Sequence, residues 1–137
     1  MQLDERLEEA SKHIMNLKFC ELRLQNEDRF PWVILIPTKE NVVELIDLSD
    51  DEQILLMQEI SIVSRAMQEI FSPDKLNIAA LGNIVKQLHI HIIARYENDA
   101  AWPNPVWGHF NDHAHYTYDT LRRRIKQLRA ALGCSDI

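Results

Sequence analysis

QLHIHIIAR, residues 87–95, alternates polar and apolar side chains over its first part. Because successive side chains of a β-strand point to opposite faces of the sheet, this pattern predicts a strand over Gln87–Arg95. Gln87, His89 and His91 would share one face, and the apolar residues between them would pack into the core. A rise of about 3.4 Å per residue would place the two imidazoles roughly 7 Å apart.

The flanking sequence predicts further helices and strands. Ser49 and Glu52 form a capping box that begins a helix of about twenty residues, and Pro73 prevents its continuation. Leu3–Leu17 carries apolar residues at helical spacing, which predicts a first helix. The remaining expected elements are strands over Phe19–Leu24, Trp32–Ile36 and Leu76–Leu81, a turn near Gly82-Asn83, and a last helix over Leu121–Leu132 ended by Gly133.

This order of elements is helix, two strands, helix, two strands, helix. It predicts an α+β fold with a mostly antiparallel sheet. The chain has 137 residues, no internal repeat and no linker, so we expect residues 1–137 to form one domain.

Composition limits the possible partners and compartments. The net charge of −6 argues against a nucleic-acid partner, although a local site can still bind an anionic small molecule. The run Trp32–Ile36 is too short to span a bilayer, and acidic residues interrupt Met1–Lys18 where a signal peptide would be apolar. Cys20 and Cys134 form no disulfide framework. We therefore expect a cytoplasmic protein without a membrane partner.

The two strand histidines allow three interpretations. They are inert surface groups, half of a zinc site, or catalytic groups. A zinc site needs a third ligand, for which the sequence offers His109, His113 or His115. A neutral imidazole can instead attack phosphorus when its other nitrogen is fixed by a backbone carbonyl, and then no cofactor or metal is required.

A loop rich in proline and tryptophan follows the histidine strand. It comprises Ala100–Gly108, and its Trp107 is a candidate to stack on a nucleobase. Trp32, at the start of an apolar strand, is expected to pack in the core.

Residues Cys20 to Arg95 resemble the histidine-triad (HIT) family. The histidine strand is similar to the motif His-φ-His-φ-His-φ-φ, where φ is apolar, with Gln87 in place of the first histidine. Residues 82–86, GNIVK, resemble the Gly-Gln-(Ser/Thr)-Val stretch before the triad. Val33–Pro37 resembles the Leu-Val-x-Pro strand, preceded here by Trp32 instead of a histidine.

The resemblance implies a HIT-like fold: an antiparallel sheet of about five strands, a long central helix, flanking terminal helices and a homodimer. It implies an enzyme that hydrolyses or transfers a nucleotidyl group at the α-phosphate of a nucleotide or dinucleotide substrate. The implied catalytic residues are His89 as nucleophile, His91 at the phosphate or leaving group, and Gln87 as a hydrogen-bonding neighbour. Asn83 would bind a phosphate oxygen, and Asn77 is a further candidate.

Two alternatives stay open. One is a metal-dependent enzyme that uses the His89–His91 pair. The other is a non-catalytic nucleotide-binding module that kept the fold without the first histidine.

Overall fold

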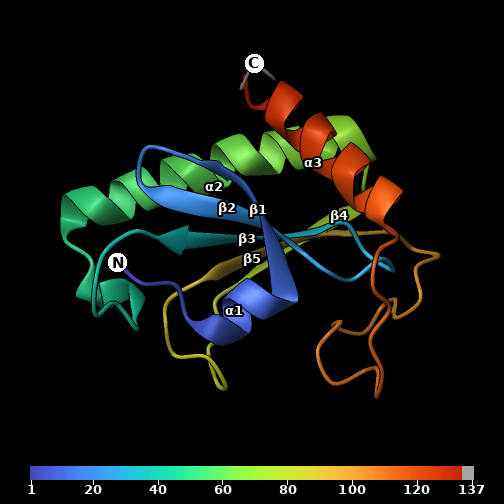
Figure 1. The fold of residues 1–137 in the computed structure, drawn as a ribbon, viewed down its shortest axis with the longest axis horizontal. Coiled ribbons are helices and arrows are strands. Elements are labelled where there is room, and N and C mark those ends of the chain that lie inside the picture. The colour runs from blue at the N-terminus through green and yellow to red at the C-terminus, as the bar shows by residue number, and fades with distance from the viewer. Residues whose placement is uncertain (134–137) are drawn as a thin grey trace.

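A computed structural model describes residues 1–133 and shows one five-stranded antiparallel sheet in the order β1-β2-β3-β5-β4 (Figure 1). The strands are β1 (Ser11–Asn16), β2 (Cys20–Gln25), β3 (Trp32–Pro37), β4 (Lys75–Ala79) and β5 (Ile90–Arg95). The helices are α1 (Glu5–Ala10), α2 (Asp50–Phe71), α3 (Tyr118–Ala131) and the short 3-10 helix η1 (Leu45–Asp47). This confirms the expected α+β fold. None of the helices in this part of the chain is long and apolar enough to cross a membrane.

Helices α2 and α3 cover one face of the sheet (Figure 1). The apolar residues of the histidine strand point to this face, as expected: Leu88, Ile90, Ile92 and Ala94 are all buried there. From the helices, Leu56, Val63, Met67 and Leu128 pack against them. Burial of this layer fixes which side of β5 faces the helices, and therefore which side carries the histidines.

Helix α1 and the loop after β5 cover the opposite face (Figure 1). The side chains of this second core are Leu7 of α1, Ala101 and Val106 of the loop, and Phe30, Trp32, Ile34, Ile36 and Ile93 of the sheet and its margin. All six residues of β3 and all six of β5 are buried. Both faces of these two neighbouring strands are covered, so the side chain of His91 lies inside the protein.

The helix boundaries agree with the capping signals in the sequence. Ser49 accepts a hydrogen bond from the Glu52 N–H, and the Glu52 side chain accepts one from the Ser49 N–H, so the predicted capping box is present. Gly133 follows α3 with φ of +78°, the left-handed conformation expected of a residue that ends a helix. Cys134 lies outside the described residues.

The predicted helix over Leu3–Leu17 is wrong in its second half. Helix α1 ends at Ala10, and Ser11–Asn16 forms the edge strand β1, paired with β2. Arg23 of β2 donates hydrogen bonds to the side-chain and backbone oxygens of Ser11. Pairing between strands therefore outweighs the helical spacing of the apolar residues, which pack on opposite faces of the sheet.

Strand β5 begins at Ile90, whereas the sequence predicted a strand from Gln87. The Leu88 N–H donates to the carbonyl of Val42, in the loop after β3, so the chain has left the ladder before Ile90. Strict alternation therefore does not extend back to Gln87, and the side chains of Gln87 and His89 need not share a face.

Candidate active site

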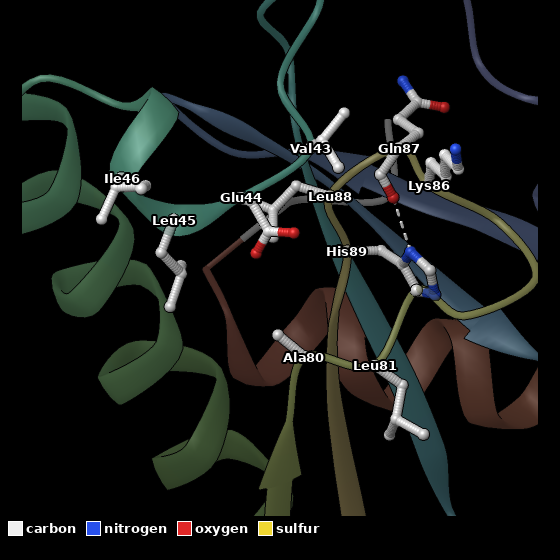
Figure 2. A pocket seen from close by; sticks show the side chains of 11 residues that line it. Val43, Glu44, Leu45, Ile46, Ala80, Leu81, Lys86, Gln87, Leu88 and His89 are labelled. Carbon is white, nitrogen blue, oxygen red and sulfur yellow. Dashed lines mark hydrogen bonds between the residues drawn. The ribbon is translucent and has the colours of Figure 1, made fainter.

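His89 lies immediately before β5 and is held by the backbone of its own loop. Its Nδ1 is 2.7 Å from the carbonyl oxygen of Gln87 (Figure 2). A carbonyl oxygen can only accept, so His89 Nδ1 carries the proton and Nε2 carries the lone pair when the ring is neutral. Only 6% of His89 is exposed, but the ring lines a pocket. The free nitrogen is thus fixed in orientation, as a nucleophile requires.

His91, on β5, has the opposite arrangement of donor and acceptor. The indole Nε1–H of Trp32 donates to His91 Nδ1 across 3.0 Å. Because indole can only donate, His91 Nδ1 carries the lone pair and the neutral ring keeps its proton on Nε2. Burial, together with the nearby charge of His89, lowers the pKa of His91 to about 3. His91 is therefore a neutral hydrogen-bond donor at physiological pH.

The two imidazoles lie closer together than strand spacing predicts. Their ring centroids are 4.8 Å apart at an interplanar angle of 70°, against the roughly 7 Å expected from two residues of strand rise. The difference arises because His89 precedes the ladder and only His91 occupies a regular strand position. One ring offers a lone pair and its neighbour offers an N–H, a combination suited to attack on an anionic phosphorus centre.

Two tryptophans surround His91. The centroid of the Trp107 ring is 5.0 Å from that of His91, and the Trp32 and Trp107 rings meet edge to face at 5.7 Å. Trp32 is buried, which confirms its packing role, and it also orients His91. The structure thus brings Trp107 to the histidine pair, where it remains half-buried.

The pocket beside His89 has a volume of about 270 Å³. Its apolar lining includes Val43, Leu45, Ile46 and Leu81, and its charged lining comprises Glu44 and Lys86 (Figure 2). Our sequence analysis did not identify residues 43–46 as part of the site. The available sequence signal was the cluster of apolar residues Val43, Leu45 and Ile46 between the third strand and the long helix. The structure leaves Ile46 84% exposed.

The side chain of Gln87 does not contact His89. Figure 2 shows its amide turned away from the imidazole, while the Gln87 carbonyl oxygen makes the bond to His89. The amide instead binds the N-terminal segment, with Gln87 Oε1 accepting from the Asp4 N–H at 2.8 Å. The backbone carbonyl of Gln87, and not its side chain, therefore orients His89.

The two asparagine candidates occupy different surroundings. Asn83 is exposed on the loop that leads to His89, next to Gly82, which has φ of +77°. A Cβ at Gly82 would lie 3.1 Å from the carbonyl oxygen of Val85, so this turn favours glycine. Asn77 on β4 accepts a hydrogen bond from Arg95, a residue that pairs with Asp99, and is thereby engaged in packing.

Among the described residues, the candidate third ligands His109, His113 and His115 form no metal site with His89 and His91. His109 packs against Phe110, and the rings of His113 and His115 lie 5.9 Å from each other. Within residues 1–133, no three His, Cys, Asp or Glu side chains are grouped to hold a metal ion. His91 could coordinate through Nε2 only by moving its proton to Nδ1, where the N–H of Trp32 points.

The chain is similar to a known protein family and to several solved structures. The family model described as HIT domain matches residues 6–98. A histidine triad protein from Bradyrhizobium japonicum has 44% identity and a TM-score of 0.93, with 96% of this chain and 97% of that chain covered. Histidine triad proteins from Sinorhizobium meliloti and Marinobacter aquaeolei have 38% and 39% identity, each with a TM-score of 0.92. The alignments cover 95% and 96% of this chain, respectively, and 96% of each relative. A comparison with curated proteins found no match.

The matching structures have the same fold over nearly their whole length, and the matched family model spans the histidine strand. The chain therefore belongs to the HIT-domain, or histidine triad, family.

Proposed function

We propose that the protein cleaves nucleotide conjugates at the α-phosphorus through a covalent nucleotidyl-His89 intermediate. The observation that carries this proposal is the opposed orientation of the two rings. His89 is held with the lone pair on Nε2, and its neighbour 4.8 Å away is held with a proton on Nε2. Membership of a family whose members are generally nucleotide-binding hydrolases or transferases supports the same chemistry.

In the first step, His89 Nε2 attacks the α-phosphorus and the bond from phosphorus to the leaving group breaks. The His91 Nε2–H donates a hydrogen bond to a phosphate oxygen and so stabilises the charge that builds up there. In the second step, water attacks the same phosphorus and the bond to His89 Nε2 breaks. The proton that the attacking water loses passes to solvent, and an amine leaving group takes up a proton from solvent as it departs. Hydrolysis thus gives a nucleoside monophosphate and the leaving group, and attack by another nucleophile instead of water gives transfer.

The pocket beside His89 supplies a surface for the part of the substrate that does not react. Apolar side chains such as Leu45 and Leu81 suit the face of a nucleobase, and Lys86 at its margin suits an anionic group. We assign Asn83 to a phosphate oxygen because it is exposed on the loop that ends at His89. We assign Trp107 to contact with the nucleotide, because its half-buried ring lies beside His91.

The direct test is turnover of a nucleoside phosphoramidate and of a dinucleoside polyphosphate. We expect His89→Ala to abolish cleavage of every conjugate that the wild type cleaves. His113→Ala is the matched control, because His113 is exposed and its ring lies beside that of His115. Wild-type turnover by His89→Ala would refute the assignment. Binding of nucleotides without any turnover by the wild type would identify the protein as a non-catalytic module.

We also propose that two copies form a homodimer through the side of the molecule that carries β4 and the exposed face of α2. Strand β4 is an edge strand, and its Ile78 is about half exposed. Helix α2 exposes Ile54, Met57 and Ile62. An edge strand and exposed apolar side chains on a helix are both features that proteins normally cover.

A further inference from the structure

The side chain of Gln87 makes two contacts with the backbone of the N-terminal segment. Its Oε1 accepts from the Asp4 N–H at 2.8 Å, and its Nε2 donates to the Gln2 carbonyl at 3.3 Å. These two backbone groups flank Leu3, which itself packs against the second core. The side chain of Gln87, which was expected next to His89, therefore binds a segment more than eighty positions away in the sequence.

The chemistry of these contacts is specific to an amide. A primary amide presents a donor and an acceptor on one edge, as a neighbouring β-strand does with its backbone groups. A carboxylate at this position would offer two acceptors, one of them facing the Gln2 carbonyl. The two nitrogens of an imidazole diverge from each other, so a histidine could bind only one of the two backbone groups.

The segment held by Gln87 lines a second pocket next to the one beside His89. This second pocket, of about 450 Å³, lies between residues 1–5 and residues 39–43, and Gln87 lines both this pocket and the one beside His89. Arg6 adds another tether by donating to the carbonyl of Ile84, on the loop that leads to His89. The hydrogen bonds of Arg6, together with the nearby charge of His89, hold the pKa of Asp4 below its usual value.

We propose that Gln87 is a positioning residue whose side-chain amide holds residues 2–5 as one wall of the second pocket, and that this pocket, which meets the pocket beside His89 at Gln87, receives part of the substrate. The backbone carbonyl of the same residue orients His89. One residue thus couples the nucleophile to the wall beside it. The contribution to substrate binding rests on the proposed function, whereas the contribution to the position of the segment does not.

Amide hydrogen exchange at Asp4, followed by NMR on the full chain, tests the structural part. We expect Gln87→Ala to accelerate exchange of the Asp4 amide about tenfold, as loss of one hydrogen bond would. Gln87→Glu and Gln87→His should also accelerate it, because neither can bind both backbone groups. Gln53→Ala is the matched control, since its side-chain amide binds the Leu48 carbonyl elsewhere. Unchanged exchange at Asp4 in Gln87→Ala would overturn the proposal.

Steady-state kinetics test the functional part. Removal of the wall should raise KM for the nucleotide conjugate about fivefold to tenfold and change kcat by less than about threefold, because the carbonyl that fixes His89 remains. A fall in kcat with unchanged KM would contradict a positioning role and indicate contact with the reacting atoms. In His89→Ala, the Asp4 amide should exchange as in the wild type. Failure of the proposed function would therefore be distinguishable from failure of this inference.

Discussion

Trp32 Nε1–H donates to His91 Nδ1 across 3.0 Å, which joins the first residue of β3 to the second residue of β5. This bond sets which nitrogen of His91 carries the proton. The resemblance to the family places a histidine at position 32, so the indole stands where an imidazole is expected. Unlike an imidazole, an indole N–H can only donate, and it therefore fixes one tautomer of its partner.

Replacement of Trp32 by Phe should release this constraint. The ring would still fill most of the buried volume, but His91 would lose its donor and populate both tautomers. We expect kcat to fall about tenfold, which corresponds to about 1.4 kcal/mol of transition-state stabilisation. Nitrogen NMR of the imidazole reports the tautomer directly, and Trp102→Phe serves as the control for loss of an indole elsewhere. An unchanged His91 tautomer and rate would disprove the role of Trp32.

His91 should remain neutral throughout the physiological range. Its pKa of about 3 means that a pH titration followed by imidazole NMR should show no protonation of His91 from about pH 8 to about pH 5. Protonation of His91 with a midpoint near its usual value, about 6.5, would contradict the burial of this ring.

The same pKa shift predicts a change in stability with pH. Between about pH 6.5 and pH 3, the unfolded chain binds a proton at His91 that the folded protein does not, so the free energy of unfolding falls as the pH falls through this window. His91→Phe removes this contribution and should weaken the loss of stability between about pH 7 and pH 5. Chemical denaturation at both pH values measures the difference. An equal loss in both proteins would show that His91 is not responsible.

Asp99 should matter for stability rather than for chemistry. It binds Arg95 through two hydrogen bonds of 2.8 and 3.1 Å, and only 1% of the Arg95 side chain is exposed. Burial raises the pKa of Asp99, but hydrogen bonds from Arg95 and from backbone N–H groups outweigh it and lower the pKa to about 2. The stabilisation by Asp99 is therefore present above about pH 4 and is lost as the pH falls towards 2.

Asp99→Ala leaves the guanidinium of Arg95 without its carboxylate and should lower the free energy of unfolding by about 3 kcal/mol. Asp112→Ala is a suitable comparison, because Asp112 pairs with Arg29 at the surface, with 76% of its side chain exposed. That variant should lose less than about 1 kcal/mol. Urea denaturation at neutral pH decides between these values, and equal effects would contradict the importance of the buried pair.

The proposed dimer predicts an effect of charge on the exposed face of α2. Met57→Glu should shift the protein from dimer to monomer in size-exclusion chromatography with light scattering, because burial of an unpaired carboxylate is costly. Tyr118→Glu, at an exposed position of α3, should leave the mass unchanged. A wild-type protein that is monomeric at about 100 μM would refute the dimer, since stable dimers associate well below this concentration.

Much of the fold follows from local sequence signals. Alternation identified Leu88, Ile90, Ile92 and Ala94 as core residues, and the capping box gave the start of α2. The edge strand β1 was missed because its apolar residues also fit a helix. Its identity depends on pairing with β2 and on hydrogen bonds from Arg23, which are contacts distant in sequence.

The histidine pair could be predicted, but its surroundings could not. Strand alternation and the motif indicated His89 and His91 together. The partner of His91 is Trp32, 59 positions away, and the side chain of Gln87 reaches Asp4, 83 positions away. Neither contact has a local signal, because both depend on how the two central strands and the N-terminal segment come together.

The most direct test of the account is detection of nucleotide bound covalently to His89. Wild-type protein mixed with a nucleoside phosphoramidate or a dinucleoside polyphosphate should be quenched within one turnover and measured by intact-protein mass spectrometry. We predict a mass increase of one nucleotidyl group, mapped to His89, stable to base and labile to acid, and absent in His89→Ala but present in His113→Ala. Turnover by the wild type with no such adduct, or an adduct that persists in His89→Ala, would contradict His89 as the nucleophile.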